Sequence, residues 1–416
     1  MAIKVLIVVG ARPNFMKAAP IIRAIGEHNR RNEGAQIRHL LVHTGQHYDA
    51  LMSDQFFIDL DLPKPDVHLG VGSGSQAAQT AEILEKFEQV LARECPDVVI
   101  VVGDVNSTLA CALATAKLTV APKNSRPLLA HVEAGLRSFD RRMPEEINRI
   151  VTDHLADLLF VTEKSGVANL RREGISSEKI FFVGNTMIDS LLAFKDRADK
   201  SRILDRLDLC APANGNGKRA TVKPYALLTL HRPSNVDDLA AFQNVLEGIS
   251  ELREQLEIIL PVHPRTRKRI GEFGLERYFE PDTALGCGRV RLIEPLGYLD
   301  FLCLMKNAHL VLTDSGGVQE ETTCLGVPCV TLRENTERPV TVRHGTNIIG
   351  GTSAERIRNA VAGQISRKVR RRTPEKWDGK AAGRIVSILA NTVDHHPGTE
   401  GPFTDGPQPV DPDERP

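Results

Sequence analysis

Short, continuous runs of valine, isoleucine and leucine alternate with amphipathic stretches, and this alternation constrains the fold more than any other feature. Such apolar runs are typical of strands covered on both faces, and short connections to helical stretches suit right-handed βαβ units. The pattern predicts strands at residues 4–10, 38–44, 97–103, 128–132, 158–162, 180–183, 225–230, 257–262, 290–293, 310–313 and 329–332. Between them it predicts helices, including 13–26, 76–93, 107–117 and 144–155.

The alternation is interrupted near residues 200–224, where the segment 210–218 is small, polar and rich in turn-forming residues. The sequence therefore predicts an α/β protein with two doubly wound domains, residues 1–195 and 196–371. The tail from 393 to 416 is rich in proline, aspartate and glycine and poor in apolar residues, which predicts disorder.

Charge and hydropathy argue against several classes of function. Lys plus Arg and Asp plus Glu both number 53, so the chain lacks the charge bias typical of nucleic-acid or membrane-surface binders. No apolar stretch reaches the roughly 18 residues of a membrane span, and the apolar run at 5–9 is too short for a signal peptide. Seven cysteines, an odd number without a CxxC pair, predict core thiols in a reducing cytoplasm.

The chemically unusual residues fall at the carboxyl ends of the predicted strands in both domains. In open parallel sheets, ligands bind outside these ends. Two such edges that face each other would form a cleft between the domains, and we expect the functional site there.

The first of these strand ends is residues 10–17, Gly-Ala-Arg-Pro-Asn-Phe-Met-Lys. A single glycine is not a dinucleotide-binding fingerprint, which needs three. Gly10 nevertheless permits close backbone approach, Pro13 suits the first position of a helix, and a helix N-terminus attracts anions. Arg12 could therefore bind a phosphate. A plain turn with an exposed Arg12 is equally compatible with this stretch alone.

Three carboxylates follow strands of the first domain or begin the helix after one: Asp104, Glu133 and Glu145. Asp104 could instead cap the next helix, and Glu145 could simply be a partner of the helix dipole. Carboxylates that converge on one edge are a common source of acid–base pairs, so the set predicts a site of proton transfer. A metal site is the weaker alternative, because no His/Asp spacing supports it.

Two histidines, His231 and His263, end successive strands of the second domain, each beside a proline. Two histidines in equivalent places favour a site that binds diphosphate or transfers protons over two separate core residues.

A turn rich in small residues follows the strand at 310–313, where Ser315, Gly316 and Gly317 open a helix. Free backbone N–H groups at such a turn can hold a diphosphate. Glu321, one turn into the helix, could accept hydrogen bonds from ribose hydroxyls. A simple N-cap with a tight turn is the alternative.

Together, these stretches resemble the bacterial UDP-N-acetylglucosamine 2-epimerases of the non-hydrolysing type. The resemblance covers about residues 4–390, and its ordered motifs are GARPNFMKAAP, TGQHYD, GDVNST, HVEAGLRS, PEEINR, LHRPSN, PVHP, TDSGGVQEE and NTERPVT. Each motif is weak alone, whereas the ordered set is specific. The resemblance implies the GT-B architecture, two Rossmann-like domains facing across a cleft, with a C-terminal helix at about 372–392 crossing back to the first domain.

The resemblance also implies roles for individual residues. The catalytic group would be Asp104, Glu133, Glu145 and His231. The substrate-binding group would be Arg12, Lys17, Gln46, Arg149, His263, Ser315, Gly316, Gly317, Glu321 and Arg338. The resemblance implies no cofactor and no metal. It implies a UDP-sugar as the partner, neither nucleic acid nor a membrane, and a homodimer in the cytoplasm.

The implied activity is the reversible inversion of carbon 2 of UDP-N-acetylglucosamine to give UDP-N-acetylmannosamine, a precursor of cell-surface polysaccharides. The proton on C2 has no adjacent carbonyl to acidify it, so its removal is easier when it is coupled to loss of UDP from C1. An anti elimination to a glycal, followed by re-addition of UDP, needs a clamp on the leaving group and acid–base groups around the sugar.

One segment departs from the family pattern. Many members carry an arginine that acts with the residue equivalent to Gln46 on a second, activating substrate molecule, whereas residues 69–76 here contain no arginine. The glycine–serine loop in this segment also resembles branches that act on modified or hydrolysed UDP-sugars. The alternatives are therefore a hydrolysing 2-epimerase, an epimerase of a modified UDP-N-acetylhexosamine, a GT-B glycosyltransferase and a sugar-nucleotide sensor.

Overall fold

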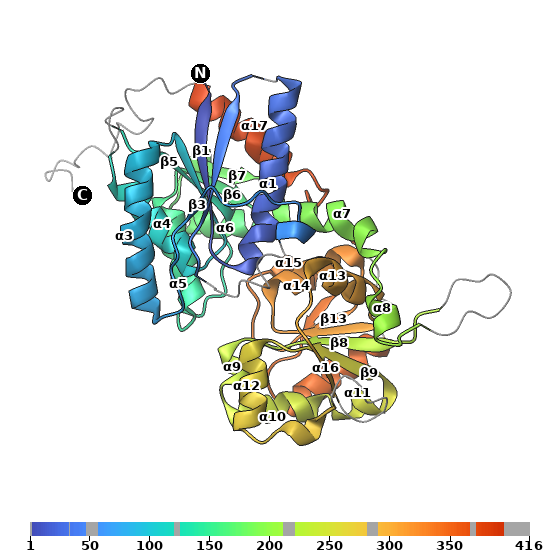
Figure 1. Ribbon diagram of the computed structural model, residues 1–416. Coiled ribbons are helices and arrows are strands. Elements are labelled where there is room, and N and C mark those ends of the chain that lie inside the picture. Colours follow the sequence, from blue (N-terminus) through green and yellow to red (C-terminus); the bar gives the residue numbers. More distant parts are fainter. Residues whose placement is uncertain are drawn as a thin grey trace, which may run out of the picture.

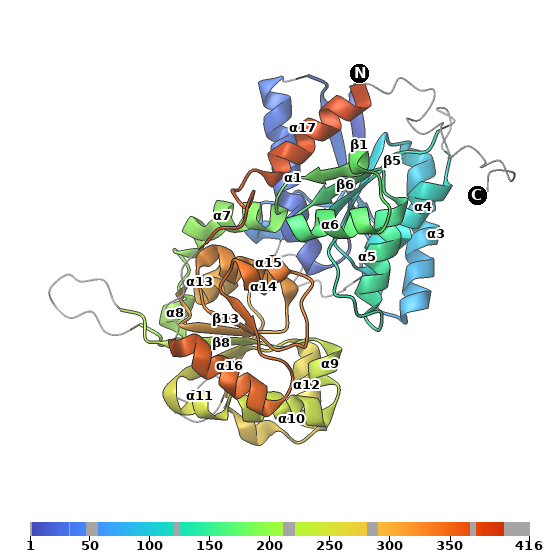
Figure 2. The same cartoon turned by 180° about the vertical axis from the view of Figure 1, so that it is seen from behind.

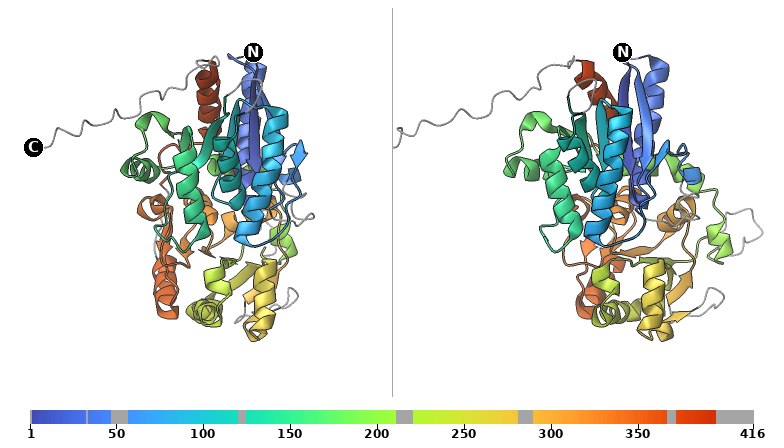
Figure 3. Two further views of the ribbon diagram at one scale, coloured as in Figure 1. Left: turned by 90° about the vertical axis from the view of Figure 1, so that its left-hand side faces the viewer. Right: turned by 60° about the vertical axis from the view of Figure 1, so that its left-hand side comes forward.

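Two parallel β-sheets, each with helices on both faces, form two halves that lie one above the other (Figure 1, Figure 2 and Figure 3). The computed structural model describes residues 2–32, 34–46, 57–119, 125–210, 221–280, 290–366 and 372–394. The first sheet has the strand order β3-β2-β1-β4-β5-β6-β7, and the second has the order β10-β11-β9-β8-β12-β13-β14. The strand order reverses between β1 and β4 and between β8 and β12, which are the places where such sheets bind ligands.

The strands of the first sheet are β1 (Ile3–Val9), β2 (Ile37–His43), β3 (Val67–His68), β4 (Val98–Val102), β5 (Leu128–Ala134), β6 (Leu158–Val161) and β7 (Ile180–Phe182). Those of the second are β8 (Tyr225–Thr229), β9 (Glu257–Pro261), β10 (Phe279–Glu280), β11 (Val290–Ile293), β12 (Leu310–Thr313), β13 (Cys329–Thr331) and β14 (Asn347–Ile349). All five residues of β4 are buried, as expected for a continuous apolar run in the middle of a covered sheet.

The helices of the first half are α1 (Arg12–Arg31), α3 (Gln76–Glu94), α4 (Asn106–Lys117), α5 (Pro144–Leu155), α6 (Lys164–Arg172) and α7 (Thr186–Ala198). The following helices are α8 (Ile203–Arg206), α9 (Pro233–Val236), α10 (Leu239–Gly248), α11 (Ser250–Gln255), α12 (Pro264–Glu272), α13 (Tyr298–Asn307), α14 (Gly316–Leu325), α15 (Pro339–Arg343), α16 (Ala354–Ser366) and α17 (Ala381–Asp394). Short 3₁₀ turns occupy Ser177–Lys179 and Glu276–Tyr278.

The hydrophobic core joins the two halves. Helices α3 and α4 cover one face of the first sheet, and α10 and α16 cover one face of the second. A third apolar cluster is continuous from α1, α7 and α17 of the upper half to α13 and α14 of the lower half. Because this cluster crosses between the halves, it holds their facing edges together.

We propose a domain division at 195/196 and 371/372. Helix α7 lies at the first of these boundaries and packs on α1 on one side and on α13 and α14 on the other. Residues 395–416, most of the tail whose composition predicts disorder, lie outside the described residues.

The C-terminal segment returns to the first half and is fastened there by polar contacts. Trp377 is buried, and its ring N–H donates to the carbonyl of Thr162 at 3.0 Å. The carboxylate of Asp189 accepts from the backbone N–H groups of Ala381 and Ala382, where α17 begins. Helix α17 then packs along α1, as Figure 2 shows. The helix is shorter than the predicted 372–392, because residues 372–380 form the connecting segment.

We expect Trp377→Phe to lower the free energy of unfolding by about 1–3 kcal/mol, because phenylalanine leaves the carbonyl of Thr162 without its buried donor. Urea unfolding followed by circular dichroism measures this, since Trp377 is the single tryptophan. Tyr278→Phe is the control, because its hydroxyl contacts only the exposed side of Arg277 and its loss should cost little. Equal stabilities of the two variants would contradict the structural role of Trp377.

Candidate functional site

The carboxyl edges of the two sheets meet at a pair of loops. Asn335, after β13, donates to the carbonyl of Ser138, after β5, at 3.5 Å. The guanidinium of Arg333 lies 3.8 Å from the sulfur of Met143. The sequence predicted that the functional residues gather where the two edges face each other, and the residues at this junction include several of them.

Glu133 lies at the centre of this junction. It is the next-to-last residue of β5, has a φ of 77°, and coincides with an irregularity in the pairing of β5 with β6. This strained backbone is unusual for a glutamate and often marks a functional position. Its carboxylate, 5% exposed, forms ion pairs with Lys17 of α1 and with Arg338 of the lower half.

The guanidinium of Arg338 has a carboxylate partner at each of its nitrogens. Nη2 contacts Glu133, Nε lies 2.8 Å from Glu320, and Nη1 lies 2.7 Å from Glu337. We call Lys17, Glu133, Glu320, Glu337 and Arg338 the interface ion cluster. All its members are buried, so each charge depends on its partners for stability.

Asp104 follows β4 and pairs with Arg149 of α5. It does not cap α4, whose N-cap is Val105, so the alternative role as a helix cap is excluded. Burial raises the pKa of Asp104, but the positive charges of Arg149, Lys17 and Arg338 outweigh burial and hold the pKa below its usual value. Asp104 is therefore an ionised carboxylate beside the interface ion cluster.

The two glutamates that begin α5 differ in their surroundings. Glu146 is buried, accepts from the backbone N–H groups of Ser138 and Phe139, and pairs with Arg149 at 2.8 Å. It therefore fixes the loop after β5 and orients Arg149. Glu145 is half-buried at the N-terminus of the same helix, where it remains the candidate for chemistry.

His231, which follows β8, is oriented by a buried aspartate. Its Nδ1 lies 2.8 Å from the carboxylate of Asp314, which also accepts from the backbone N–H groups of His231 and Arg232. Burial opposes ionisation of Asp314, but the contacts with His231 and Arg232 lower its pKa to about 2. The ring of His263 lies 6.3 Å from that of His231, so the two histidines share one edge as predicted.

The turn at the start of α14 approaches the interface ion cluster closely. The Ser315 hydroxyl makes no capping hydrogen bond, so it is not used as a helix cap. A Cβ added to Gly316 would lie 2.4 Å from Nη1 of Arg338, and one added to Gly317 would lie 3.0 Å from Met187. Glycine is thus required at Gly316 because the guanidinium lies against it.

Glu321 is buried on α14 and accepts from the hydroxyl of Tyr298 at 3.0 Å. Burial is the main cause that raises the pKa of Glu321 to about 8. The proposed contact with a ribose would add hydroxyl partners to this buried carboxyl group.

Glu321 should make stability fall as pH rises. Its pKa in the folded protein is above its usual value of 4.5, so the native state keeps a proton that the unfolded chain loses between pH 4.5 and about 8. Over that window one such group lowers the unfolding free energy by up to about 1.4 kcal/mol per pH unit. Glu321→Gln should make this slope smaller in urea unfolding at pH 5 to 8, because Glu163 and Glu320 also have raised pKa values and contribute to it, whereas Glu294→Gln, at an exposed carboxylate, should leave it unchanged. The same slope in both variants would exclude Glu321 as its origin.

Two further predicted residues lie at the edges of this arrangement. Arg12, at the start of α1, donates to the carbonyl of Leu296 in the lower half at 3.5 Å. Gln46 is buried, and its side chain accepts from the backbone N–H and the hydroxyl of Ser107. In this conformation Gln46 therefore supports the start of α4.

Sequence reasoning did not assign roles to Asp314, Glu320 or Glu337. Each lies within a quoted motif, beside a residue that was chosen: Ser315, Glu321 and Arg338. Their signal is burial of a charge, which appears only once the chain has folded: Asp314 meets the segment of His231, 83 residues away, and Arg338 connects Glu320 and Glu337 to Glu133. The sequence gives no direct sign of such burial.

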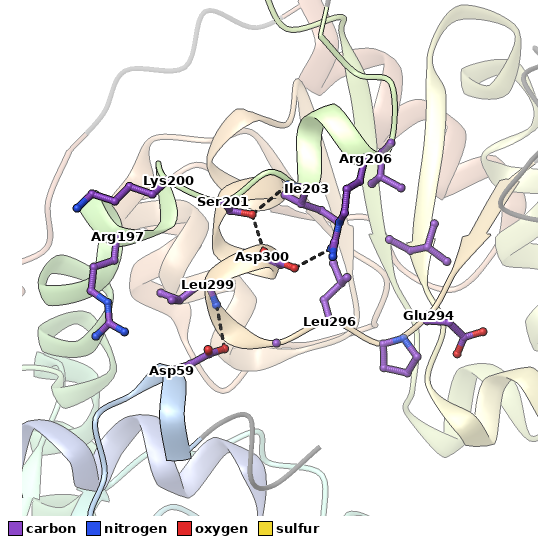
Figure 4. A pocket seen from close by; sticks show the side chains of 14 residues that line it. Asp59, Arg197, Lys200, Ser201, Ile203, Arg206, Glu294, Leu296, Leu299 and Asp300 are labelled. Carbon is purple, nitrogen blue, oxygen red and sulfur yellow. Dashed lines mark hydrogen bonds and ion pairs between the residues drawn. The ribbon is translucent and has the colours of Figure 1, made fainter. Parts of the chain in front are cut away.

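A cavity of about 770 Å³ lies beside the connection between the halves, lined by residues of α7, α8 and the loop between β11 and α13. Figure 4 shows Asp300 of α13 contacting Ser201 and Arg206, with Asp59 near the backbone of Leu299. None of the predicted site residues lines this cavity, so it is separate from the interface ion cluster.

Within the described segments, no three His, Cys, Asp or Glu side chains gather as metal ligands. None of the helices in these segments is both long enough and apolar enough to cross a bilayer.

Comparisons with known proteins agree with this arrangement. A family model described as UDP-N-acetylglucosamine 2-epimerase matches residues 29–390. The Methanocaldococcus jannaschii protein named UDP-N-acetylglucosamine 2-epimerase is 44% identical, covering 93% of this chain and 98% of that protein. A Pseudomonas aeruginosa protein named UDP-2,3-diacetamido-2,3-dideoxy-D-glucuronate 2-epimerase is 38% identical, covering 93% of this chain and 99% of that protein.

A solved structure extends the similarity to three dimensions. The crystal structure of Methanocaldococcus jannaschii UDP-GlcNAc 2-epimerase in complex with UDP-GlcNAc and UDP matches with a TM-score of 0.82 and 43% identity, covering 94% of this chain and all of that one. Together with the match over most of the chain, this confirms the two-domain GT-B-like fold. The chain belongs to the UDP-N-acetylglucosamine 2-epimerase family.

Proposed function

We propose that this protein interconverts UDP-N-acetylglucosamine and UDP-N-acetylmannosamine by inverting carbon 2 of the sugar. The observation that carries the proposal is the contact chain from Glu133 through Arg338 to Gly316 at the start of α14. This chain joins a carboxylate suited to proton transfer to a turn suited to diphosphate. Family membership supports the same activity.

The proposed reaction begins with anti elimination. A carboxylate of the group Asp104, Glu133 and Glu145 takes the proton from C2. The C1–O bond to UDP breaks, its electron pair leaves with the UDP oxygen, and a C1–C2 double bond forms in the glycal. UDP then returns to C1 while a proton reaches C2 on the opposite face. Charges are balanced throughout, and no redox partner is required.

The lower half is proposed to hold UDP. Backbone N–H groups at Ser315, Gly316 and Gly317 would bind phosphate oxygens, because α14 begins there and its N-terminus favours negative charge. Glu321 would accept from the ribose. His231, oriented by Asp314, would stabilise the charge on departing UDP, as a positioned donor does in other displacement reactions.

Four further predicted residues complete the proposed site. Arg12 would bind the diphosphate from the upper half, because it reaches the loop after β11. Lys17 and Arg149 would hold the carboxylates of Glu133 and Asp104 in place through their ion pairs. His263 would line the site beside His231. No cofactor or metal has a part in this reaction.

A modified UDP-sugar is the second candidate substrate. The 38% identical relative from Pseudomonas aeruginosa is named for a diacetamido-glucuronate sugar, and the glycine–serine loop at 72–75 favours such branches. The hydrolysing reaction would use the same elimination, with water adding in place of UDP. A glycosyltransferase would have no use for the three carboxylates.

Proton NMR of the purified protein with UDP-N-acetylglucosamine in deuterium oxide tests the proposal. Deuterium at C2 together with a new UDP-N-acetylmannosamine signal would support reversible epimerisation. Free UDP with N-acetylmannosamine would show the hydrolysing reaction. No change, with turnover of the diacetamido-glucuronate nucleotide, would move the assignment to the second substrate.

We also propose that the protein acts in the cytoplasm as a homodimer. The proposed substrates are nucleotide-sugars, and the family resemblance implies a homodimer in the cytoplasm. Sedimentation equilibrium of the full chain measures its mass in solution, and a single species of 45.8 kDa would contradict the dimer.

A further inference from the structure

A single arginine connects the acid–base side of the junction to the nucleotide side. Arg338 comes from the loop before α15, in the lower half, yet one of its nitrogens contacts Glu133 in the upper half. Its other two nitrogens face Glu320 and Glu337, both in its own half. The guanidinium thus has a carboxylate within ion-pair distance of each of its nitrogens, and Nη1 and Nη2 donate hydrogen bonds to Glu337 and Glu133.

We propose that Glu320 is a positioning residue, which turns Arg338 toward Glu133 and balances its charge so that Glu133 can act as a base. The inference rests on the proposed function, because it needs Glu133 to exchange a proton with the sugar. It gives a role to a residue that touches neither sugar nor nucleotide.

The position of Glu320 supports this role. It lies on α14, five residues after the phosphate turn begins at Ser315, and its side chain is completely buried. A buried carboxylate without a charged partner is strongly disfavoured, and Arg338 supplies that partner at 2.8 Å. The ion pair therefore places a negative charge at the Nε side of the guanidinium, while Nη2 contacts Glu133.

The charge balance gives a second argument. Glu133 is contacted by two cations, Lys17 and Arg338, which both attract its carboxylate. Glu320 and Glu337 also pair with Arg338. Their negative charges partly neutralise the guanidinium and so weaken its attraction for the carboxylate of Glu133. The pKa of Glu320 is raised to about 7, because burial and the charge of Glu133 raise it by more than Arg338 lowers it.

The other groups that face Glu320 come from both halves. Glu163, before α6, is buried, and burial raises its pKa to about 7, with a contribution from Glu320. Lys17 lowers the pKa of Glu320, whereas Glu320 raises the pKa of Glu321, its neighbour on α14. The negative charges thus outnumber the cations on this side, and Arg338 is the group that most favours the ionised form of Glu320.

The test is steady-state kinetics of Glu320→Gln, which keeps the shape of the side chain and removes its charge. We expect kcat to fall about 10-fold to 100-fold, as a small misplacement of a reacting group does. KM and the calorimetric Kd for UDP should change less than twofold, because Glu320 does not touch the nucleotide. The acidic limb of the pH profile of kcat/KM should move to lower pH, since the substitution removes the negative charge of Glu320 from the surroundings of Glu133.

A double variant separates positioning from a loss of structure. Glu320→Gln combined with Arg338→Lys should be no slower than Arg338→Lys alone, because both changes break one unit. Asp189→Asn is the matched control: it alters another buried carboxylate, which holds the start of α17, and kcat should stay within twofold of wild type. If Glu320→Gln does not fold, Glu320→Asp should still lower kcat at least threefold with KM unchanged.

The outcomes are distinguishable. An active wild type with normal kcat and an unmoved pH profile in Glu320→Gln would overturn this inference alone. Multiplying losses in the double variant would also overturn it, because they would place Glu320 outside the unit. A wild type that does not exchange the C2 proton of either UDP-sugar would overturn the proposed function together with this inference.

Discussion

Replacing Glu133 with glutamine should lower kcat about 10²-fold to 10⁴-fold, the range expected when an acid–base group is removed. Glutamine keeps the length of the side chain but cannot take a proton from C2. The affinity for UDP should be equal or higher, because a negative charge is lost near the proposed diphosphate site while Lys17 and Arg338 remain. Deuterium incorporation at C2 measures the chemistry, and calorimetry with UDP measures the binding.

The control for Glu133→Gln is Glu173→Gln. Glu173 also pairs with an arginine of the first half, Arg137, but it is partly exposed and lies outside the interface ion cluster. We expect Glu173→Gln to turn over substrate at the wild-type rate. Turnover within threefold of wild type in Glu133→Gln would remove this residue from the mechanism and leave Asp104 or Glu145 as the base.

Gly316→Ala should reduce kcat by about 100-fold, although it adds only one methyl group. That methyl would lie 2.4 Å from Nη1 of Arg338 and 2.8 Å from the carboxylate of Glu337, so the guanidinium must move. A displacement of about 1 Å in a reacting site can cost two orders of magnitude in rate. The added methyl group would also narrow the turn at residues 315–317, which is proposed to bind phosphate, so the affinity for UDP should fall. Steady-state kinetics and calorimetry measure the two effects.

Gly363→Ala is the matched substitution. Gly363 lies inside α16, and nothing lies within 4 Å of an added Cβ. Alanine there should raise the unfolding free energy by about 0.5–1 kcal/mol, because it reduces the freedom of the unfolded chain. Activity should not change. If Gly316→Ala behaved like Gly363→Ala, the close contact with Arg338 would have no functional role.

The buried middle strands of both sheets and the edge strand β7 could be predicted from the sequence, whereas the edge strands β3, β10 and β14 could not. The sequence contains recognisable continuous apolar runs at β1, β4, β5, β8, β9 and β12. Their predicted bounds agree with the structure to within about two residues. The strands β3, β10 and β14 are two or three residues long and are not continuous apolar runs. A short edge strand forms by pairing with a neighbouring strand, and the pattern of residues along the chain does not reveal which strand that neighbour is.

The site, too, could be predicted only in part. Strand ends and glycine turns located Glu133, His231 and Ser315, because parallel sheets bring such ends to one edge. The partners of these residues were not predictable, since Glu133 and Arg338 are 205 positions apart in the chain. Their contact depends on how two separately formed sheets are oriented. The roles assigned to individual site residues remain predictions until the substitutions are measured.

The return of the C-terminal segment has a consequence during synthesis of the chain. The α1 and α7 surface of the upper half is covered by α17, which is translated after every strand of both sheets. Until then, this apolar surface stays exposed, although the rest of the upper half was translated before residue 200. A nascent chain in this state can bind other apolar surfaces. We therefore expect a fragment that stops before Trp377 to depend on chaperones in the cell, even though it contains every strand of both sheets.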